Sequence, residues 1–235
     1  MVYNINSGYG QLLAMQIAAA VGPVIGRIHV VLEDSDAAVV QNMITNMFVP
    51  DADGNVRFYR TLAAAYSAVT SNANDVILLS AHTTHSLTTG IAWTKNRVHV
   101  IGMDGGGRLV QQGAKVELAG AVDSAYVVKV TGVRNSFRNV KFIHSSTHAN
   151  ALSVVQMGGE GNLYQNSSFV FGVVDNLDLT TAHEVLFGED SGTFVGCTFG
   201  ADTLLTSAAR SVLHFDQVTT SQEPKSNQFR ECLFN

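Results

Sequence analysis

The chain has 235 residues, 46% hydrophobic and 14% charged, so it can bury a large core and is not a disordered chain. Its formal net charge of −5 gives no basic field to attract nucleic acid or an anionic membrane. Its two cysteines are too few for a disulfide-stapled module, and no Cys/His cluster indicates zinc, so neither metal nor cofactor is expected. Three prolines against 21 glycines, with many Val, Thr and Ser residues, favour an all-β chain of short strands and turns.

Residues 1–55 differ in texture from the rest, and we expect them to form an N-terminal anchoring segment. The apolar stretch at 12–25 is shorter than the ~20 residues that a bilayer crossing needs, and no Lys or Arg precedes it. We therefore expect neither a transmembrane helix nor a signal peptide. "RIHVVLE" predicts a strand, and residues 34–48 predict a helix capped by Asp34 or Ser35.

A short Ala-rich helix is predicted at about 60–70, directly before an apolar strand at 76–79. An open stack of strands exposes unpaired backbone and apolar side chains at its first layer. A helix whose apolar face carries Leu62 and Ala65 is suited to cover that end. Residues 56–235 are therefore predicted to form one unit that begins with a capping helix.

Four similar six-residue motifs recur in the second half of the chain: "FRNVKF" at 137–142, "YQNSSF" at 164–169, "FVGCTF" at 194–199 and "FRECLF" at 229–234. Their first residues are separated by 27, 30 and 35 positions, and an apolar strand precedes each motif. A period of this size is typical of repeat architectures. Short strands that wind round and stack on the previous turn form a parallel β-helix, with coils ~4.8 Å apart.

Stacking places equivalent side chains of successive coils over one another. The last phenylalanine of each motif should therefore join one interior column: Phe142, Phe169, Phe199 and Phe234. Cys197 and Cys232 also occupy equivalent positions, where parallel Cβ vectors are poor geometry for a disulfide. We predict that both are free, buried thiols that act as small apolar residues.

The segment at 57–104 resembles the opening of pectin-lyase-like right-handed β-helix proteins, in its Ala-rich helix, its "DVILL" strand and its "KNRVHVIGM" strand. The stretch 57–235 is compatible with that family. More narrowly, "MFVPDADGNVRFYRTLAAAYSAVTSNANDVILL" is similar to β-helix proteins carried on the virions of tailed bacteriophages. The resemblance implies a right-handed, single-stranded parallel β-helix. The family contains polysaccharide lyases and hydrolases, and also non-enzymatic spikes and decoration proteins, so the residues must decide the function.

An enzyme of this family needs carboxylates gathered on one face: several around calcium in a lyase, or two held ~5 to 10 Å apart in a hydrolase. The weak candidates are Asp175, Asp178, Glu189, Asp190 and Asp216. Asp175 and Asp178 lie in a predicted loop, and adjacent Glu189 and Asp190 in extended backbone would point to opposite faces. We interpret these residues as solvated loop acids, and the chain as having no catalytic residues.

Four residues are candidates for contact with a glycan or a protein partner: Trp93, Tyr126, Arg134 and Arg138. The two aromatic residues could equally fill the interior or a subunit seam, and the two arginines could be ordinary outward-facing strand residues. The pairs His82 and His85, and His144 and His148, fall among Thr, Ser and Asn. We interpret these histidines as surface or turn residues.

The sequence therefore predicts a non-enzymatic bacteriophage virion protein, either a capsid decoration or cement protein or a fibre-like surface protein, with its β-helix projecting outward from the particle. We expect a homotrimer, because closed symmetry covers apolar outer strand faces, in contact with the major capsid protein or other virion proteins. The alternatives are a tailspike-type polysaccharide lyase or glycoside hydrolase, and an adhesin that binds a host surface glycan.

Overall fold

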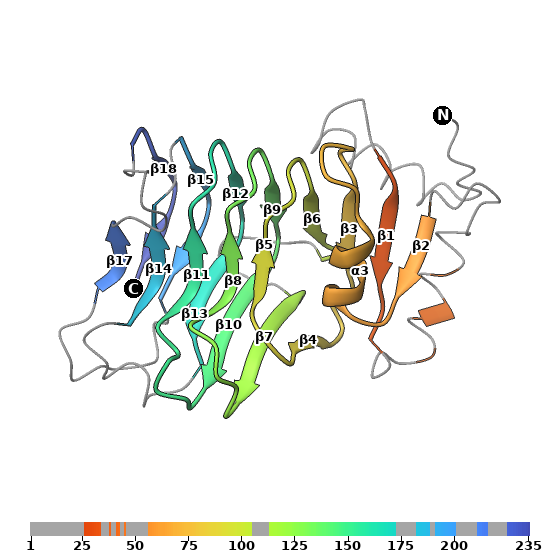
Figure 1. Ribbon diagram of the computed structural model, residues 1–235, viewed down its shortest axis with the longest axis horizontal. Helices are drawn as coiled ribbons and strands as arrows, with labels where there is room; N and C mark the ends of the chain where they lie inside the picture. The colour runs from red at the N-terminus through yellow and green to blue at the C-terminus, as the bar shows by residue number, and fades with distance from the viewer. Residues whose placement is uncertain are drawn as a thin grey trace.

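A computed structural model describes residues 26–33, 38, 41–42, 45, 56–104, 113–172, 182–188, 191–200, 211–215 and 225–235. Every strand pairing in these ranges is parallel. From β3 (Val76–Leu79) onward the chain visits three sheets in turn and returns to the first one coil further along. The strands therefore lie side by side along the long axis (Figure 1). Because parallel crossovers are right-handed, this is a right-handed parallel β-helix, as the sequence predicts.

Three parallel sheets, A, B and C, form the walls of the coil. In spatial order, sheet A consists of β2 (Val56–Tyr59), β1 (Ile28–Val31), β3 (Val76–Leu79), β6 (His99–Gly102), β9 (Ser136–Arg138), β12 (Leu163–Gln165), β15 (Thr193–Val195) and β18 (Gln228–Arg230). Sheet B consists of β4 (Thr84–Leu87), β7 (Lys115–Gly120), β10 (Lys141–Ser146), β13 (Ser168–Phe171), β16 (Thr198–Phe199) and β19 (Leu233–Phe234). Sheet C consists of β5 (Ile91–Trp93), β8 (Tyr126–Val130), β11 (Ser153–Met157), β14 (His183–Phe187) and β17 (Ser211–Phe215).

A column of phenylalanine rings in sheet B holds successive coils in register. Phe142, Phe169, Phe199 and Phe234 pair in sequence across β10, β13, β16 and β19. Their ring centroids are 5.8, 5.2 and 5.0 Å apart and the rings are nearly parallel. The first three rings are buried, whereas Phe234 in the last coil is 49% exposed. Offset stacking adds to the free energy that burial of the rings contributes.

A second aromatic column lines sheet A. Its rings belong to the first residue of each motif: Phe137, Tyr164, Phe194 and Phe229. Successive centroids are 5.3, 4.8 and 4.8 Å apart. The two columns meet edge to face, for example at Tyr164 and Phe169, whose centroids are 6.0 Å apart at 71°. The recurrence of aromatic residues in the sequence therefore reflects direct contact between coils.

The turn from sheet A to sheet B consists of one left-handed residue in each motif: Asn139, Asn166, Gly196 and Glu231. Their φ angles lie between 48° and 62°, in the region that Gly and Asn adopt most easily.

The residue that follows each of these turn residues points inward, and in the third and fourth motifs it is Cys197 and Cys232. Both thiols are free. Cys197 is buried, and burial raises the pKa of its thiol well above the usual value. Cys232 is only half-buried, contrary to prediction, because it belongs to the last coil.

Buried asparagines satisfy the backbone just before the strands of sheet A. The side-chain oxygen of Asn162 accepts a hydrogen bond from the Asn135 N–H at 2.8 Å, and that of Asn135 accepts from the Val98 N–H at 2.9 Å. Asn162 also donates to the Gly132 carbonyl at 3.2 Å. Both amide side chains are 1% exposed. Buried backbone groups that lack strand partners need such bonds.

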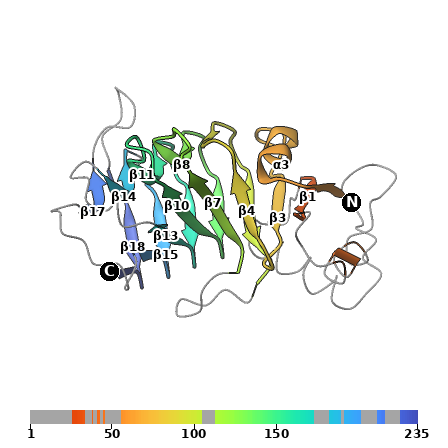
Figure 2. The ribbon, with the colours of Figure 1, turned by 90° about the horizontal axis from the view of Figure 1, so that it is seen from below.

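The capping helix predicted at about 60–70 is α3 (Leu62–Ala68), and it covers the first coil at the N-terminal end (Figure 2). Thr61 caps it by accepting a hydrogen bond from the Ala64 N–H at 3.1 Å. Leu62 and Ala65 are buried against the core. The Lys95 ammonium donates to three carbonyls at the end of the helix, at 2.7 to 2.9 Å, and so satisfies acceptors that the helix leaves open.

The strand expected at the N-terminus is β1, and it lies within sheet A between β2 and β3. Residues 28–31 therefore extend the β-helix instead of standing apart from it, because β1 gives the edge of β3 a parallel partner. Of the helix expected over 34–48, the four described residues, at 38, 41, 42 and 45, are helical. Asp34 and Ser35 lie outside the described residues. The anchoring role of this segment stays a prediction.

Candidate anion-binding groove

The corner between sheets C and A repeats the same backbone shape in coil after coil. A left-handed residue lies at the corner in each of six coils, with φ between 53° and 65°: Asn72, Arg97, Arg134, Gly161, Ser191 and Ser226. Its N–H donates to a carbonyl of the next coil, from Arg97 to Val133 at 3.0 Å and from Arg134 to Glu160 at 2.9 Å. The corner backbone is therefore a hydrogen-bonded ladder, which fixes the spacing of the side chains that project from it.

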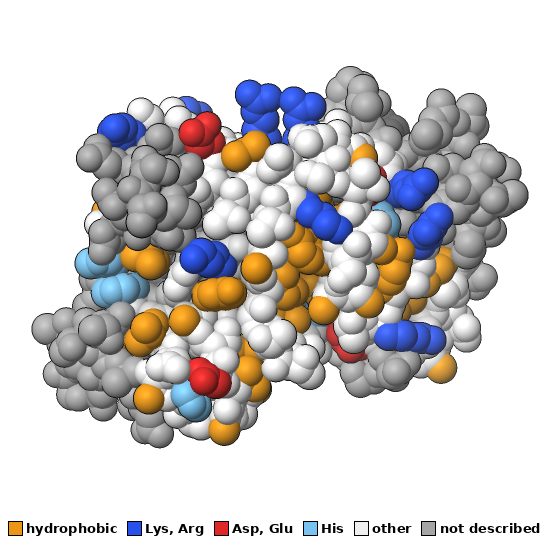
Figure 3. Space-filling model, viewed as in Figure 1, with side chains coloured by type: hydrophobic (Ala, Val, Ile, Leu, Met, Phe, Trp, Pro, Cys, Tyr) orange, Lys and Arg blue, Asp and Glu red, His pale blue; other side chains and the backbone are white. Residues whose placement is uncertain are grey.

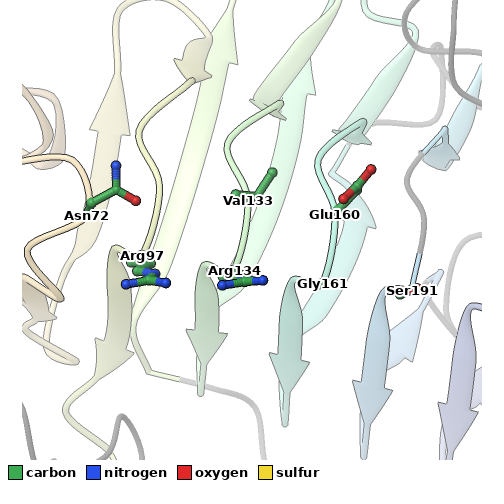
Figure 4. A pocket seen from close by; sticks show the side chains of 7 residues that line it. All are labelled: Asn72, Arg97, Val133, Arg134, Glu160, Gly161 and Ser191. Atoms are coloured by element: carbon green, nitrogen blue, oxygen red, sulfur yellow. The ribbon is translucent and has the colours of Figure 1, made fainter.

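A groove of about 280 Å³ runs along this corner, parallel to the axis of the coil (Figure 4). It is lined by Asn72, Arg97, Val133, Arg134, Glu160, Gly161 and Ser191. These residues come from five successive coils, so the lining is a row of corner positions and not a cluster from one loop. A linear ligand that lies along the coil axis fits this arrangement best.

Two arginines from adjacent coils dominate the charge of the groove. Arg97 and Arg134 extend in parallel from equivalent corner positions (Figure 4). Neither guanidinium makes an ion pair or a hydrogen bond within the part of the chain that the structure describes. Figure 3 shows two basic side chains standing together at the upper edge, where the loops before β6 and β9 lie in Figure 1.

Stacking brings like charges close together. Adjacent coils lie ~4.8 Å apart, and two unit charges about 5 Å apart repel by ~0.8 kcal/mol even in bulk water. An anion held between the two guanidiniums removes this repulsion and accepts charge-assisted hydrogen bonds from both. Because the corner backbone is fixed, the main chain holds Arg97 and Arg134 at equivalent positions one coil apart, from which both side chains can reach one anion.

Glu160 gives the groove an opposite charge one coil beyond Arg134. Its side chain is exposed, and Figure 4 shows its carboxylate directed away from both guanidiniums. It makes no ion pair or side-chain hydrogen bond within the described ranges. Gly161 follows it and presents no side chain. The groove is therefore basic over two coils and acidic over the next.

The structure places the four predicted contact residues in different environments. Arg134 lies in the groove, but Arg138 lies on the outer face of sheet A, where it donates to the Gln165 side chain and where burial lowers the pKa of its guanidinium. Trp93 is 1% exposed and stacks on Tyr66 beneath the capping helix, so of the alternatives left open by the sequence it takes the interior and not a surface contact. Its indole fills the first coil. Tyr126 begins β8, half-buried, and does not line the groove.

The acidic residues proposed for an enzyme, Asp175, Asp178, Glu189, Asp190 and Asp216, all lie outside the described residues. Within the ranges that the structure does describe, no group of three or more His, Cys, Asp or Glu side chains could hold a metal ion. The same ranges contain no helix long and apolar enough to cross a membrane.

Sequence reasoning missed Arg97 and Glu160. The signal that could have found Arg97 is its distance in sequence from the next strand. Arg97 stands two residues before the start of β6, and Arg134 two residues before the start of β9. Since these strands pair directly, equal offsets place the two arginines in one row. Glu160 stands three residues before β12 and so occupies the neighbouring row.

Other titratable groups are buried and serve the fold. Asp75, 1% exposed, accepts from the backbone N–H groups of Arg27 and Thr70 at 2.8 and 2.7 Å, and its carboxylate lies 3.5 Å from His29. Burial alone would raise the pKa of Asp75, but the adjacent His29 side chain and the two backbone hydrogen bonds hold it below the usual value. His99 lies 2.8 Å from the Ser136 hydroxyl, and burial, with Arg138 nearby, lowers its pKa to about 4.

Two histidines interpreted as turn or surface residues are interior. His85 is fully buried, 2.9 Å from the Ser80 carbonyl and 3.2 Å from the Glu33 carboxylate. His144 is also fully buried, and burial lowers its pKa to about 4. Both side chains point into the coil because strand alternation places them in columns with apolar residues.

Comparison with models of protein families gives no match, and neither does comparison with curated proteins. Among solved structures, a pectin methylesterase mutant in complex with a hexasaccharide aligns with 75% of this chain and 50% of its own, at 13% identity and a TM-score of 0.49. A pectate lyase aligns with 75% of this chain and 48% of its own, at 16% identity and a TM-score of 0.41. The chain thus spans about half the length of each of these two structures.

Proposed function

We propose that this chain is a non-enzymatic surface protein of a bacteriophage particle that binds an acidic glycan along the groove at Arg97 and Arg134. The resemblance of residues 47–79 to β-helix proteins of phage virions supports the location. Among the decoration, fibre and adhesin roles open to such a protein, the groove favours the adhesin. The stacked, uncompensated arginine pair is the observation that carries this proposal.

Carboxylated sugars are the ligand class that fits the pair. A carboxylate accepts paired hydrogen bonds from guanidinium groups, and bonds of this kind contribute about 1.5 to 3 kcal/mol each. Val133 offers an apolar contact, and Asn72 and Ser191 offer polar groups for sugar hydroxyls at the two ends. A single groove of this size would bind weakly, so several grooves on one particle would be needed for firm attachment.

The binding test compares wild type with the double variant Arg97→Gln/Arg134→Gln. Oligosaccharides of polygalacturonate and alginate, with neutral dextran oligomers as a reference, are titrated by calorimetry at physiological ionic strength. We expect the wild type to bind an acidic oligosaccharide and the double variant to bind it at least tenfold more weakly, because two charge-assisted contacts are lost.

The matched control is Lys115→Gln/Lys129→Gln, which removes the same charge from β7 and β8, away from the groove. It should bind within about twofold of wild type. An equal loss in the control, or a wild type that binds no acidic oligosaccharide, would overturn the proposal. The same mixtures are then assayed for new reducing ends and unsaturated products, because cleavage would establish the polysaccharide-degrading alternative instead.

We further propose that the chain acts as a homotrimer attached to the capsid or another virion protein. A trimer would present three grooves and so raise the avidity for a polymeric glycan. Negative-stain images of assembled particles test the location: density at capsid threefold positions indicates decoration, and density at a tail tip indicates adhesion. A soluble monomer with no particle would contradict both.

A further inference from the structure

We infer that Glu160 makes the groove selective for a heteroglycan, in which an acidic unit over the arginine pair is followed by a neutral unit. This inference rests on the proposed glycan binding and specifies its substrate class. Arg97, Arg134 and Glu160 come from three successive coils, so they form a charge sequence of plus, plus, minus along the corner.

The groove offers a continuous path past these charges. Gly161, the left-handed corner residue next to Glu160, presents no side chain, and a Cβ built there would have only the Arg134 side chain nearby, at 3.8 Å. A linear glycan can therefore continue from the arginine pair into the acidic section. Because coils repeat every ~4.8 Å, the part of the glycan that follows the bound carboxylate passes the coil that carries Gly161 and Glu160.

Glu160 does not simply neutralise its neighbours. It forms no ion pair with either arginine, and its carboxylate is directed away from both guanidiniums (Figure 4). Its charge is therefore available to the ligand. A hydroxyl of a neutral sugar can donate a hydrogen bond to this carboxylate. A second uronic acid would instead place its own carboxylate beside Glu160, and the two negative charges would repel each other.

The size of the effect follows from the coil spacing. Two unit charges of the same sign about 5 Å apart in water change a binding equilibrium about fourfold, and more where the groove excludes water. Wild type should therefore bind an alternating oligosaccharide of uronic acid and neutral N-acetylhexosamine at least fourfold more tightly, per acidic unit, than an oligouronate of equal length.

Glu160→Gln tests the assignment, and Glu117→Gln on β7 is its charge-matched control. Calorimetry with both oligosaccharides should show that Glu160→Gln strengthens binding of the oligouronate at least fourfold and removes the preference for the alternating chain. Glu117→Gln should leave the preference within twofold of wild type. Arg97→Gln/Arg134→Gln should lose both ligands.

The outcomes separate this inference from the proposed function. A wild type that binds both oligosaccharides equally, with no change in Glu160→Gln, would overturn the selectivity and leave acidic-glycan binding intact. Equal effects of Glu160→Gln and Glu117→Gln would show that net charge, not position, sets the preference, and would also overturn it. Failure of the wild type to bind either chain would overturn the proposed function itself.

Discussion

Replacing Phe169 with alanine should remove the centre of the phenylalanine column. Its ring is fully buried and stacks on Phe142 at 5.8 Å and on Phe199 at 5.2 Å. Truncation of a buried phenylalanine costs about 3 to 5 kcal/mol, and the loss of two stacked partners places this case at the upper end, about 4 to 5 kcal/mol. Phe234→Ala is the matched comparison, since that ring is 49% exposed and stacks on one neighbour at 5.0 Å. It should cost about half as much, ~2 kcal/mol.

Urea unfolding monitored by circular dichroism gives both values, provided that the m-value stays constant between the variants. A difference of about 2 kcal/mol in unfolding free energy is the expected result. Equal costs at the two positions, or a cost below about 1.5 kcal/mol at Phe169, would refute the reasoning that burial between two coils gives the column its strength.

Three further substitutions test other contacts. Asn162→Ala should lower the unfolding free energy by about 2 to 4 kcal/mol in urea, because two buried backbone groups lose their partners. Lys95→Met should lower the unfolding free energy by about 1 to 3 kcal/mol, seen as a lower melting temperature, because Lys95 binds the carbonyls at the end of α3. Lys129→Met should change the melting temperature little, because Lys129 does not bind these carbonyls. Wild-type stability should fall as the pH drops from about 6.5 to about 4, because in this range the unfolded chain binds protons at His99 and His144, whereas in the folded chain burial lowers the pKa of both to about 4. His144→Leu should reduce that fall by up to ~3 kcal/mol, and an unchanged pH profile would contradict the assignment.

The β-helix could be predicted from the sequence because its coils touch at equivalent positions. The aromatic residues at both ends of each motif occupy two stacked columns, so their recurrence at intervals of 27, 30 and 35 residues records the coil length. The third position of each motif carries a left-handed residue, which explains why Asn or Gly occupies it in three of the four motifs. The capping helix was predictable because an open stack of strands needs one.

Burial of individual residues was less predictable. His85 and His144 point into the coil because strand alternation directs them there, yet their polar neighbours indicated a surface, and for Trp93 the sequence left interior and surface open. Cys232 shares its position with buried Cys197 but lies in the last coil, so it has a covering coil on one side only. The placement of β1 in sheet A needed long-range pairing that no local pattern reveals.

The groove could be predicted from the sequence only in part. Arg134 was predicted as a contact residue, but its partner Arg97 is 37 positions away in the chain, and only the pairing of β6 with β9 brings the two together. Glu160 has no distinctive sequence context, and its importance comes from lying one coil beyond Arg134. Sites that are made of one residue per coil are visible in the sequence only after the strands have been aligned.

The most direct test of acidic-glycan binding is a structure of the protein with a tetrasaccharide that alternates uronic acid and neutral sugar. The proposal predicts a sugar carboxylate within hydrogen-bond distance of both the Arg97 and the Arg134 guanidinium groups, and the adjoining neutral unit beside Glu160. A tetrasaccharide bound on the face of another sheet, with the groove at this corner empty, would contradict it.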